Sequence, residues 1–208
     1  IDGMESAQNT KLVGNFDQVI ICGMGGSALA GDLLKIFLEE LKIKIPVHLV
    51  RDYSLHTLAS KNSLVIVVSY SGNTEETVST YQEAKNKNFY AVVVSRNGQL
   101  IGLAQKNNDI FVRIPGPNIE PRLAVFGMLG MLVQILVQAK VASVEGARKL
   151  KSAAEKIKPL GEQQKARSIA EKLFRKIPLI YSSQKYKALA FNWKIKFRDL
   201  APCSYLNI

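Results

Sequence analysis

The chain of 208 residues is long enough for one large domain, or for one domain and part of a second. Hydrophobic residues make up 47% of it and charged residues 22%, which excludes a disordered, collagen-like or low-complexity chain. The net charge of +11 comes entirely from residues 140–208, which hold 16 basic and 5 acidic residues, because residues 1–139 hold 12 of each.

Five short apolar segments alternate with helical stretches in the first half of the chain. They are Gln18–Cys22, Pro46–Val50, Ser63–Ser69, Tyr90–Val94 and Ile110–Ile114. Three of them consist almost wholly of apolar residues, as expected of strands that are buried on both faces. Helices are predicted between them, for example at Ala28–Leu41 and at Glu75–Lys85. This alternation predicts a three-layer α/β/α domain with a parallel five-stranded sheet.

The first candidate loop, Gly23–Ala28, follows the first strand and is rich in glycine. Glycines let the backbone turn tightly and bring N–H groups up to an anion at a helix N-terminus. A tight turn that binds nothing explains the pattern about equally well. The loop is a poor match to the dinucleotide-binding motif G-x-G-x-x-G, because Ala28 stands where the last glycine belongs.

The second candidate loop follows the most apolar strand and leads into the helix predicted from Glu75. It places three hydroxyl groups, those of Ser69, Ser71 and Thr74, beside a glycine and a helix start. Hydroxyl groups and free backbone N–H groups at the positive end of a helix suit a phosphate monoester. The chain contains no G-x-x-x-x-G-K-[ST] pattern, so this is not a P-loop. The alternative is an ordinary capped turn.

A proline-rich loop and an apolar helix are predicted next. Pro115–Pro121 contains three prolines in seven residues and is expected to be extended. Leu123–Ala139 contains no charged residue, but a membrane span needs about twenty residues. We therefore expect a helix buried in the core or in a dimer interface, where Gly127 and Gly130 would allow another helix to come close.

The basic excess lies mainly on a predicted amphipathic helix, residues 149–176. Its basic residues alternate with aliphatic ones, and a single aromatic residue, Phe174, makes no aromatic platform for bases, so a solvated face is favoured over a nucleic-acid surface. Ile177–Ser183 followed by a helical stretch from Tyr186 repeats the strand–turn–helix order of Gln18–Ser27. It is typical of the first βα unit of a second sheet, and such a unit alone cannot bury its faces. Either a partner supplies the rest of this sheet or the chain is a fragment of a longer protein, and the fragment is favoured.

The cysteine and histidine counts bear on metal sites and on the compartment. Cys22, Cys203 and two histidines are too few for a disulfide framework or a structural zinc cluster. Asp2 and Glu5 stand where a signal peptide would have a basic and then an apolar stretch. We therefore expect a cytoplasmic protein.

Three motifs together resemble the sugar isomerase (SIS) domain family, and more narrowly its bifunctional phosphoglucose/phosphomannose isomerase branch. They are GMGGSALAGD at 23–32, VSYSGNTEET at 68–77 and the Pro121-Arg122 pair. The similarity extends from about Phe16 to Trp193. It implies a first SIS subdomain at 1–140, a basic helical connector at 141–176 and the start of a second, incomplete subdomain at 177–208.

The resemblance implies an isomerase that interconverts glucose 6-phosphate or mannose 6-phosphate with fructose 6-phosphate through a cis-enediolate. It further implies a homodimer that binds phosphorylated hexoses and uses no cofactor or metal. The charge pattern and the length of the apolar run, discussed above, predict neither nucleic acid nor membrane as partner. Phosphate binding would fall to Ser69, Ser71 and Thr74, sugar binding to Gly25, Gly26 and Ser27, and enediolate stabilisation to Arg122. An SIS module that only binds phosphosugars, without turnover, is the alternative.

The proton-transfer residues of the family are matched less closely. Its glutamate base follows a W-K-x-x-[FL] stretch, present here as Trp193–Phe197, and Asp199 falls in the glutamate's place. Asp199 is therefore the candidate base, with an ordinary helix-end acid as the alternative. The family's ring-opening histidine belongs to an H-N-E motif further on, which His48 and His56 do not match, so both histidines are predicted to be structural.

Overall fold

The computed structural model describes residues 2–55, 59–157 and 162–200, and only the backbone of 198–200. His56 and Cys203 lie outside the described residues. The chain divides into two compact units, Ile1–Ala147 and Arg148–Ile208, and each is described by itself.

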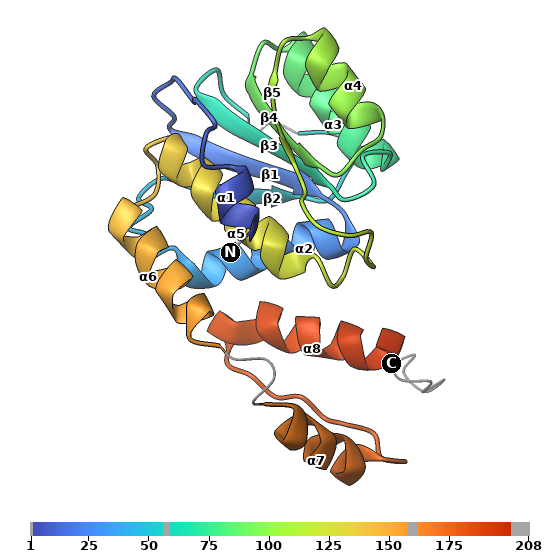
Figure 1. Cartoon of the computed structure of the whole chain (residues 1–208). Helices are drawn as coiled ribbons and strands as arrows, with labels where there is room; N and C mark the ends of the chain where they lie inside the picture. The colour runs from blue at the N-terminus through green and yellow to red at the C-terminus, as the bar shows by residue number, and fades with distance from the viewer. Residues whose placement is uncertain (1, 56–58, 158–161, 201–208) are drawn as a thin grey trace. The chain divides into compact units, whose positions relative to one another are not determined.

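Five parallel strands form the sheet of the first unit, in the order β2-β1-β3-β4-β5 (Figure 1). They are β1 (Gln18–Gly23), β2 (Val47–Val50), β3 (Ser63–Ser69), β4 (Tyr90–Ser95) and β5 (Ile110–Arg113). All five predicted segments are confirmed as strands, with bounds that differ by at most one residue. Every residue of β3, the central strand, is buried, because helices cover both faces of the sheet.

Two layers of helices complete the predicted α/β/α architecture (Figure 1). α3 (Glu75–Asn86) and α4 (Gln99–Lys106) cover one face of the sheet. The other face is covered by α2 (Gly25–Leu34), with α5 (Val125–Gln138) packed against it. The helix predicted at Ala28–Leu41 begins three residues earlier, inside the glycine loop, and gives way after Leu34 to the 3-10 turn η1 (Lys35–Phe37).

The apolar helix α5 is buried against the short helix α1 (Asp2–Ser6) as well as α2. A side chain at Gly3 would overlap the carbonyl oxygen of Gly127, and one at Gly130 would lie 3.1 Å from Met4. The expected close approach at Gly127 and Gly130 is confirmed, and α1 is the element that makes it. Within the described residues, no helix is long and apolar enough to span a membrane.

The buried thiol of Cys22, on β1, gives the fold a pH dependence. Burial raises its pKa from the usual 9.0 to about 12, with a hydrogen bond to Thr80 opposing the shift and Glu83 adding to it. Above pH 9 the unfolded chain loses a proton that the folded chain keeps, so the stability falls as the pH rises towards 12. We expect Cys22 to contribute a loss of up to about 1.4 kcal/mol per pH unit, measured by urea unfolding, so the slope should be smaller in Cys22→Ala. The slope that remains comes from groups such as Tyr81, whose pKa is also raised by burial. Equal slopes in the two proteins would contradict the assignment.

The second unit is helical in its described part, with α7 (Gln163–Leu173), the turn η4 (Gln184–Tyr186) and α8 (Lys187–Leu200). α6 (Val144–Glu155) begins in the first unit and continues into it. The single helix predicted at 149–176 is therefore wrong, because the segment holds the end of α6 and the whole of α7. No residue of α7 is buried, as expected of a solvated helix.

The strand predicted at Ile177–Ser183 does not form, and this prediction is wrong. Its apolar side chains are exposed, with Leu179 at 74% and Tyr181 at 87%. The reason is that a strand needs a neighbour to satisfy its backbone, and the described part of this unit contains no other strand. The helix predicted from Tyr186 is confirmed as α8.

Candidate functional site

The candidate site lies at the carboxyl ends of the strands in the first unit. In the order β2-β1-β3-β4-β5 the direction of winding reverses between β1 and β3, and doubly wound sheets bind ligands at such a point. Gly23 at the end of β1 pairs with Val68 near the end of β3. The two loops singled out in the sequence therefore leave neighbouring strands at the same edge.

The first loop turns from β1 directly into α2. Gly25 has a φ of +51°, a left-handed conformation that glycine adopts without steric cost. Ser27 is buried, and its Oγ accepts a hydrogen bond of 3.2 Å from the backbone N–H of Tyr70. The first loop is thus hydrogen-bonded to the second, 43 residues later in the chain.

The second loop brings its three predicted hydroxyl groups to the start of α3. Ser69 Oγ lies 2.9 Å from Thr74 Oγ1 and accepts a hydrogen bond of 3.1 Å from the N–H of Gly72. Ser71 Oγ accepts one of 3.3 Å from the N–H of Asn73. Ser69 is buried, Thr74 half-buried and Ser71 exposed. The first N–H groups of a helix have no partner within it. At the positive end of α3, these N–H groups therefore lie together with the three hydroxyl groups of the loop as possible hydrogen-bond donors.

The loop after β4 is hydrogen-bonded to the second loop. The side-chain oxygen of Asn73 accepts a hydrogen bond of 2.8 Å from the N–H of Gln99, and the N–H of Leu100 donates one of 3.0 Å to Gly72 O. Asn73 thereby satisfies an N–H group at the start of α4 and ties the two loops together. Its role in the site was not predicted, although an Asn beside a Gly in a turn is a signal for such a contact.

Arg122 lies next to the first loop. A side chain built on Gly26 would stand 3.3 Å from Pro121 O and 3.4 Å from the backbone N of Arg122, so the two backbones are in close contact. The guanidinium group of Arg122 is paired with Glu120 at 3.1 Å, and its side chain is 34% exposed. The structure thus assembles the three motifs at one edge of the sheet.

Acidic groups border the site at the first turn of α3. The hydroxyl of Tyr53 donates a hydrogen bond of 3.3 Å to Glu75. The charge of Glu76 raises the pKa of Tyr53, with burial and Glu75 adding to the shift. An anion at the loop would therefore meet a border that is negative on this side.

Two further predicted residues are not placed in this site. Asp199 belongs to α8 of the second unit, and its side chain lies outside the described residues. His48 is half-buried within β2, an edge strand of the sheet, where it pairs with Ile20 of β1. This position fits its predicted structural role.

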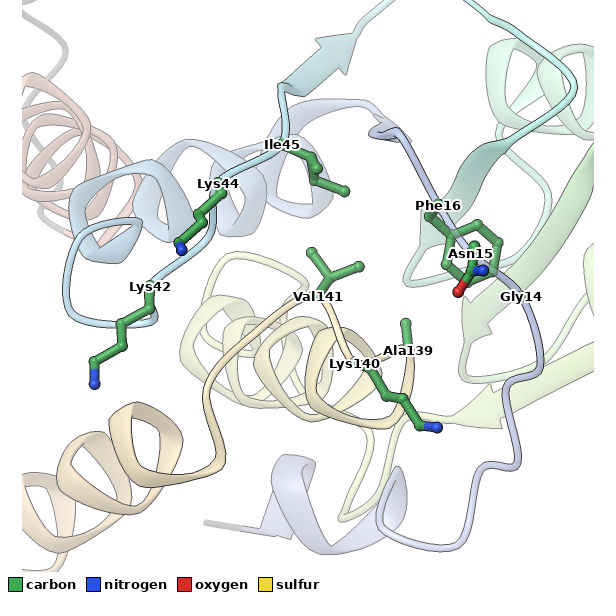
Figure 2. Close-up of a pocket in the computed structure, with 9 residues that line it drawn as sticks. All are labelled: Gly14, Asn15, Phe16, Lys42, Lys44, Ile45, Ala139, Lys140 and Val141. Carbon is green, nitrogen blue, oxygen red and sulfur yellow. The ribbon is translucent and has the colours of Figure 1, made fainter.

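A cavity of about 300 Å³ opens at the opposite, amino-terminal edge of the sheet. It is lined by residues just before β1 and β2 and just after α5, including Phe16, Ile45 and Val141. Figure 2 shows that Ile45 and Val141 face one another across it, while Lys42 and Lys140 extend away from it. None of the site residues predicted from the motifs lines this cavity, so it is separate from the loops described above.

The chain is similar in sequence to proteins of known family. Residues 15–137 match the family model of the SIS domain. The chain is 36% identical over 192 residues to a bifunctional phosphoglucose/phosphomannose isomerase of Caldicellulosiruptor bescii, covering 86% of this chain and 55% of that protein. It is 34% identical over 191 residues to the Thermoplasma volcanium protein of the same name, covering 91% and 58%. The chain thus spans about half the length of the curated relatives it matches.

Solved structures share the fold. The tagatose-6-phosphate ketose/aldose isomerase of Escherichia coli superposes with a TM-score of 0.63 at 19% identity, covering 96% of this chain and 58% of that one. The C-terminal domain of the glucosamine-fructose-6-phosphate aminotransferase of Francisella tularensis has a TM-score of 0.66 at 16% identity, covering 95% and 62%.

Proposed function

The chain belongs to the SIS domain family, and from this premise we propose that it carries a phosphosugar site of an aldose–ketose isomerase. The reaction is the interconversion of glucose 6-phosphate or mannose 6-phosphate with fructose 6-phosphate. The relatives named for this activity support it. One structural observation carries the proposal: the hydroxyl groups of Ser69 and Thr74, at the start of α3, share an edge of the sheet with Arg122.

The proposed chemistry begins with the phosphate. The hydroxyl groups of Ser69, Ser71 and Thr74 and the first N–H groups of α3 donate hydrogen bonds to its oxygens. The sugar chain then extends towards Gly25, Gly26 and Ser27, where the missing side chain of Gly25 leaves open space and that of Gly26 lets the backbone of Pro121 and Arg122 come close. This orientation directs C1 and C2 of the open-chain sugar towards the backbone of Pro121 and Arg122.

Proton transfer follows at C1 and C2. A carboxylate takes the proton from C2 of the aldose and returns it to C1, while the hydroxyl proton passes from O2 to O1, so no cofactor is consumed. The intermediate is an enediolate, and the guanidinium group of Arg122 holds its negative charge through two donors. We propose Asp199 as the carboxylate. Exchange of the Glu120 contact of Arg122 for the substrate would accompany binding.

The remaining parts of the proposal concern assembly. We propose that residues 1–140 form a first SIS subdomain, 141–176 a connector and 177–208 the start of a second. We also propose a cytoplasmic homodimer. Leu123 and Phe126, which flank the Arg122 region, are 42% and 50% exposed, and apolar surface of this kind favours a protein contact.

Removal of phosphate-binding hydroxyl groups provides the direct test. We expect Thr74→Val and Ser71→Ala each to weaken fructose 6-phosphate binding about tenfold in calorimetry, because a hydrogen bond to a charged group is lost. Ser79→Ala is the matched control, since that hydroxyl sits one turn further along α3 and donates to Tyr53 O. Unchanged affinity in both site variants would contradict the phosphate assignment.

Turnover separates an isomerase from a module that only binds. The assay follows glucose 6-phosphate formed from fructose 6-phosphate with a coupled dehydrogenase, in the presence of EDTA. Activity whose kcat/KM falls about tenfold in Thr74→Val would support the isomerase. Tight binding without turnover would favour the binding module for this 208-residue chain.

A further inference from the structure

Tyr70 stands between two of the predicted phosphate-binding serines, yet its side chain points elsewhere. It is 7% exposed, and its hydroxyl accepts a hydrogen bond of 3.1 Å from the backbone N–H of Ile119. Ile119 belongs to the proline-rich loop and precedes Arg122 by three residues. Tyr70, a residue of the second loop (the proposed phosphate loop), thus contacts the segment that carries Arg122.

The backbone of Tyr70 makes two more contacts that converge on the same region. Its N–H donates to Ser27 Oγ in the first loop, and its carbonyl oxygen accepts a hydrogen bond of 3.2 Å from the N–H of Arg96. The guanidinium group of Arg96 in turn donates to Gly116 O at 2.7 Å and to Pro117 O at 3.0 Å. Tyr70 therefore holds the proline-rich loop at two places. It contacts Ile119 near the end of the loop directly, and it is linked through Arg96 to Gly116 and Pro117 near the beginning.

We propose that Tyr70 is a positioning residue that sets the place of Arg122 relative to the bound phosphate. This inference rests on the proposed function and extends it. The phosphate loop would fix one end of the sugar phosphate, and the Tyr70–Ile119 hydrogen bond would fix the distance from that end to the guanidinium group. Charge stabilisation by a preorganised group depends strongly on such placement, whereas phosphate binding does not require it.

Two ligands separate these effects in a binding experiment. Sorbitol 6-phosphate carries the phosphate but no planar anion, whereas 5-phospho-D-arabinonohydroxamate carries the same phosphate and imitates the enediolate. We expect the wild-type chain to bind the hydroxamate at least a hundredfold more tightly. In Tyr70→Phe this preference should fall about tenfold, with the affinity for sorbitol 6-phosphate within twofold of the wild type.

The chain offers a matched control. Tyr90 hydroxyl also accepts a backbone N–H, that of Val13 at 3.4 Å, but it lies at the start of β4, away from the site edge. Tyr90→Phe should leave the preference unchanged. In an Arg122→Ala background Tyr70→Phe should have no further effect on the preference, because the group it positions is gone.

Three outcomes overturn the inference. Equal weakening of both ligands in Tyr70→Phe would make Tyr70 a structural support of the phosphate loop only. An unchanged preference would mean that the hydroxyl does not position Arg122. A wild-type chain that binds sorbitol 6-phosphate but shows no preference for the hydroxamate would refute the isomerase proposal first, and the inference would fall with it.

Discussion

Gly72→Ala is expected to lower the free energy of unfolding by about 2–5 kcal/mol, an unusually large effect for one methyl group. Gly72 has a φ of +75°, which costs a residue with a side chain about 1–2 kcal/mol. The new methyl group would also overlap the carbonyl oxygen of Asn97 and lie 2.6 Å from Ser95 Oγ. Backbone cannot rotate away as a flexible side chain does, so the two loops would separate at a further cost of about 1–3 kcal/mol.

Gly116→Ala separates the two contributions. Gly116 has a φ of +88°, but a side chain there would have no heavy atom within 4 Å. We therefore expect a loss of only about 1–2 kcal/mol, measured like that of Gly72→Ala by circular dichroism in urea. Similar losses in the two variants would show that the contact between Gly72 and Asn97 is not tight.

Gly72→Ala should also weaken ligand binding at the candidate site. The loop after β4 is attached to the second loop through Asn73 and Gln99, next to the clash. Displacement of this attachment would move the start of α3, so fructose 6-phosphate affinity should fall in Gly72→Ala and stay near the wild-type value in Gly116→Ala.

The sheet was predictable because the information is local. A strand such as Ser63–Ser69, apolar over nearly all its length, has few alternatives to burial on both faces of a parallel sheet. Once the strands are known, their carboxyl ends point to the loops at Gly23–Ala28 and Ser69–Thr77. The position of Arg122 beside Gly26 was not predictable from the spacing of the two residues, because it depends on the path of the proline-rich loop.

The contacts of Tyr70 and the fate of Ile177–Ser183 were not predictable in the same way. The partner of the Tyr70 hydroxyl is 49 residues away and depends on the path of the proline-rich loop. The available signal in the sequence was a large aromatic residue inside a loop of small polar ones. Ile177–Ser183 has the composition of a strand, but strand formation also requires a partner strand, which composition does not supply.

Arg122→Ala is expected to reduce the affinity for 5-phospho-D-arabinonohydroxamate, and any turnover, by about a hundredfold to a thousandfold. Removal of one preorganised donor to a developing oxyanion has an effect of this size. The affinity for sorbitol 6-phosphate should fall far less, because the proposed function assigns phosphate binding to the second loop. Arg122→Lys should recover only part of the loss, since an ammonium group keeps the charge but cannot donate in the planar, two-donor geometry.

Glu120→Gln is the informative companion, because it should act in the opposite direction. The carboxylate of Glu120 lies 3.1 Å from the guanidinium group and is 61% exposed. An ion pair this exposed adds little to the stability of the fold, and at the proposed site it would compete with an anionic ligand for Arg122. Its neutralisation should raise hydroxamate affinity about twofold to fivefold, and the gain should shrink as salt is added. If Arg122 served only as the partner of Glu120 on the surface, neither substitution would change the affinity. Opposite effects of the two substitutions would instead place the arginine at the ligand, with Glu120 holding it until the ligand arrives.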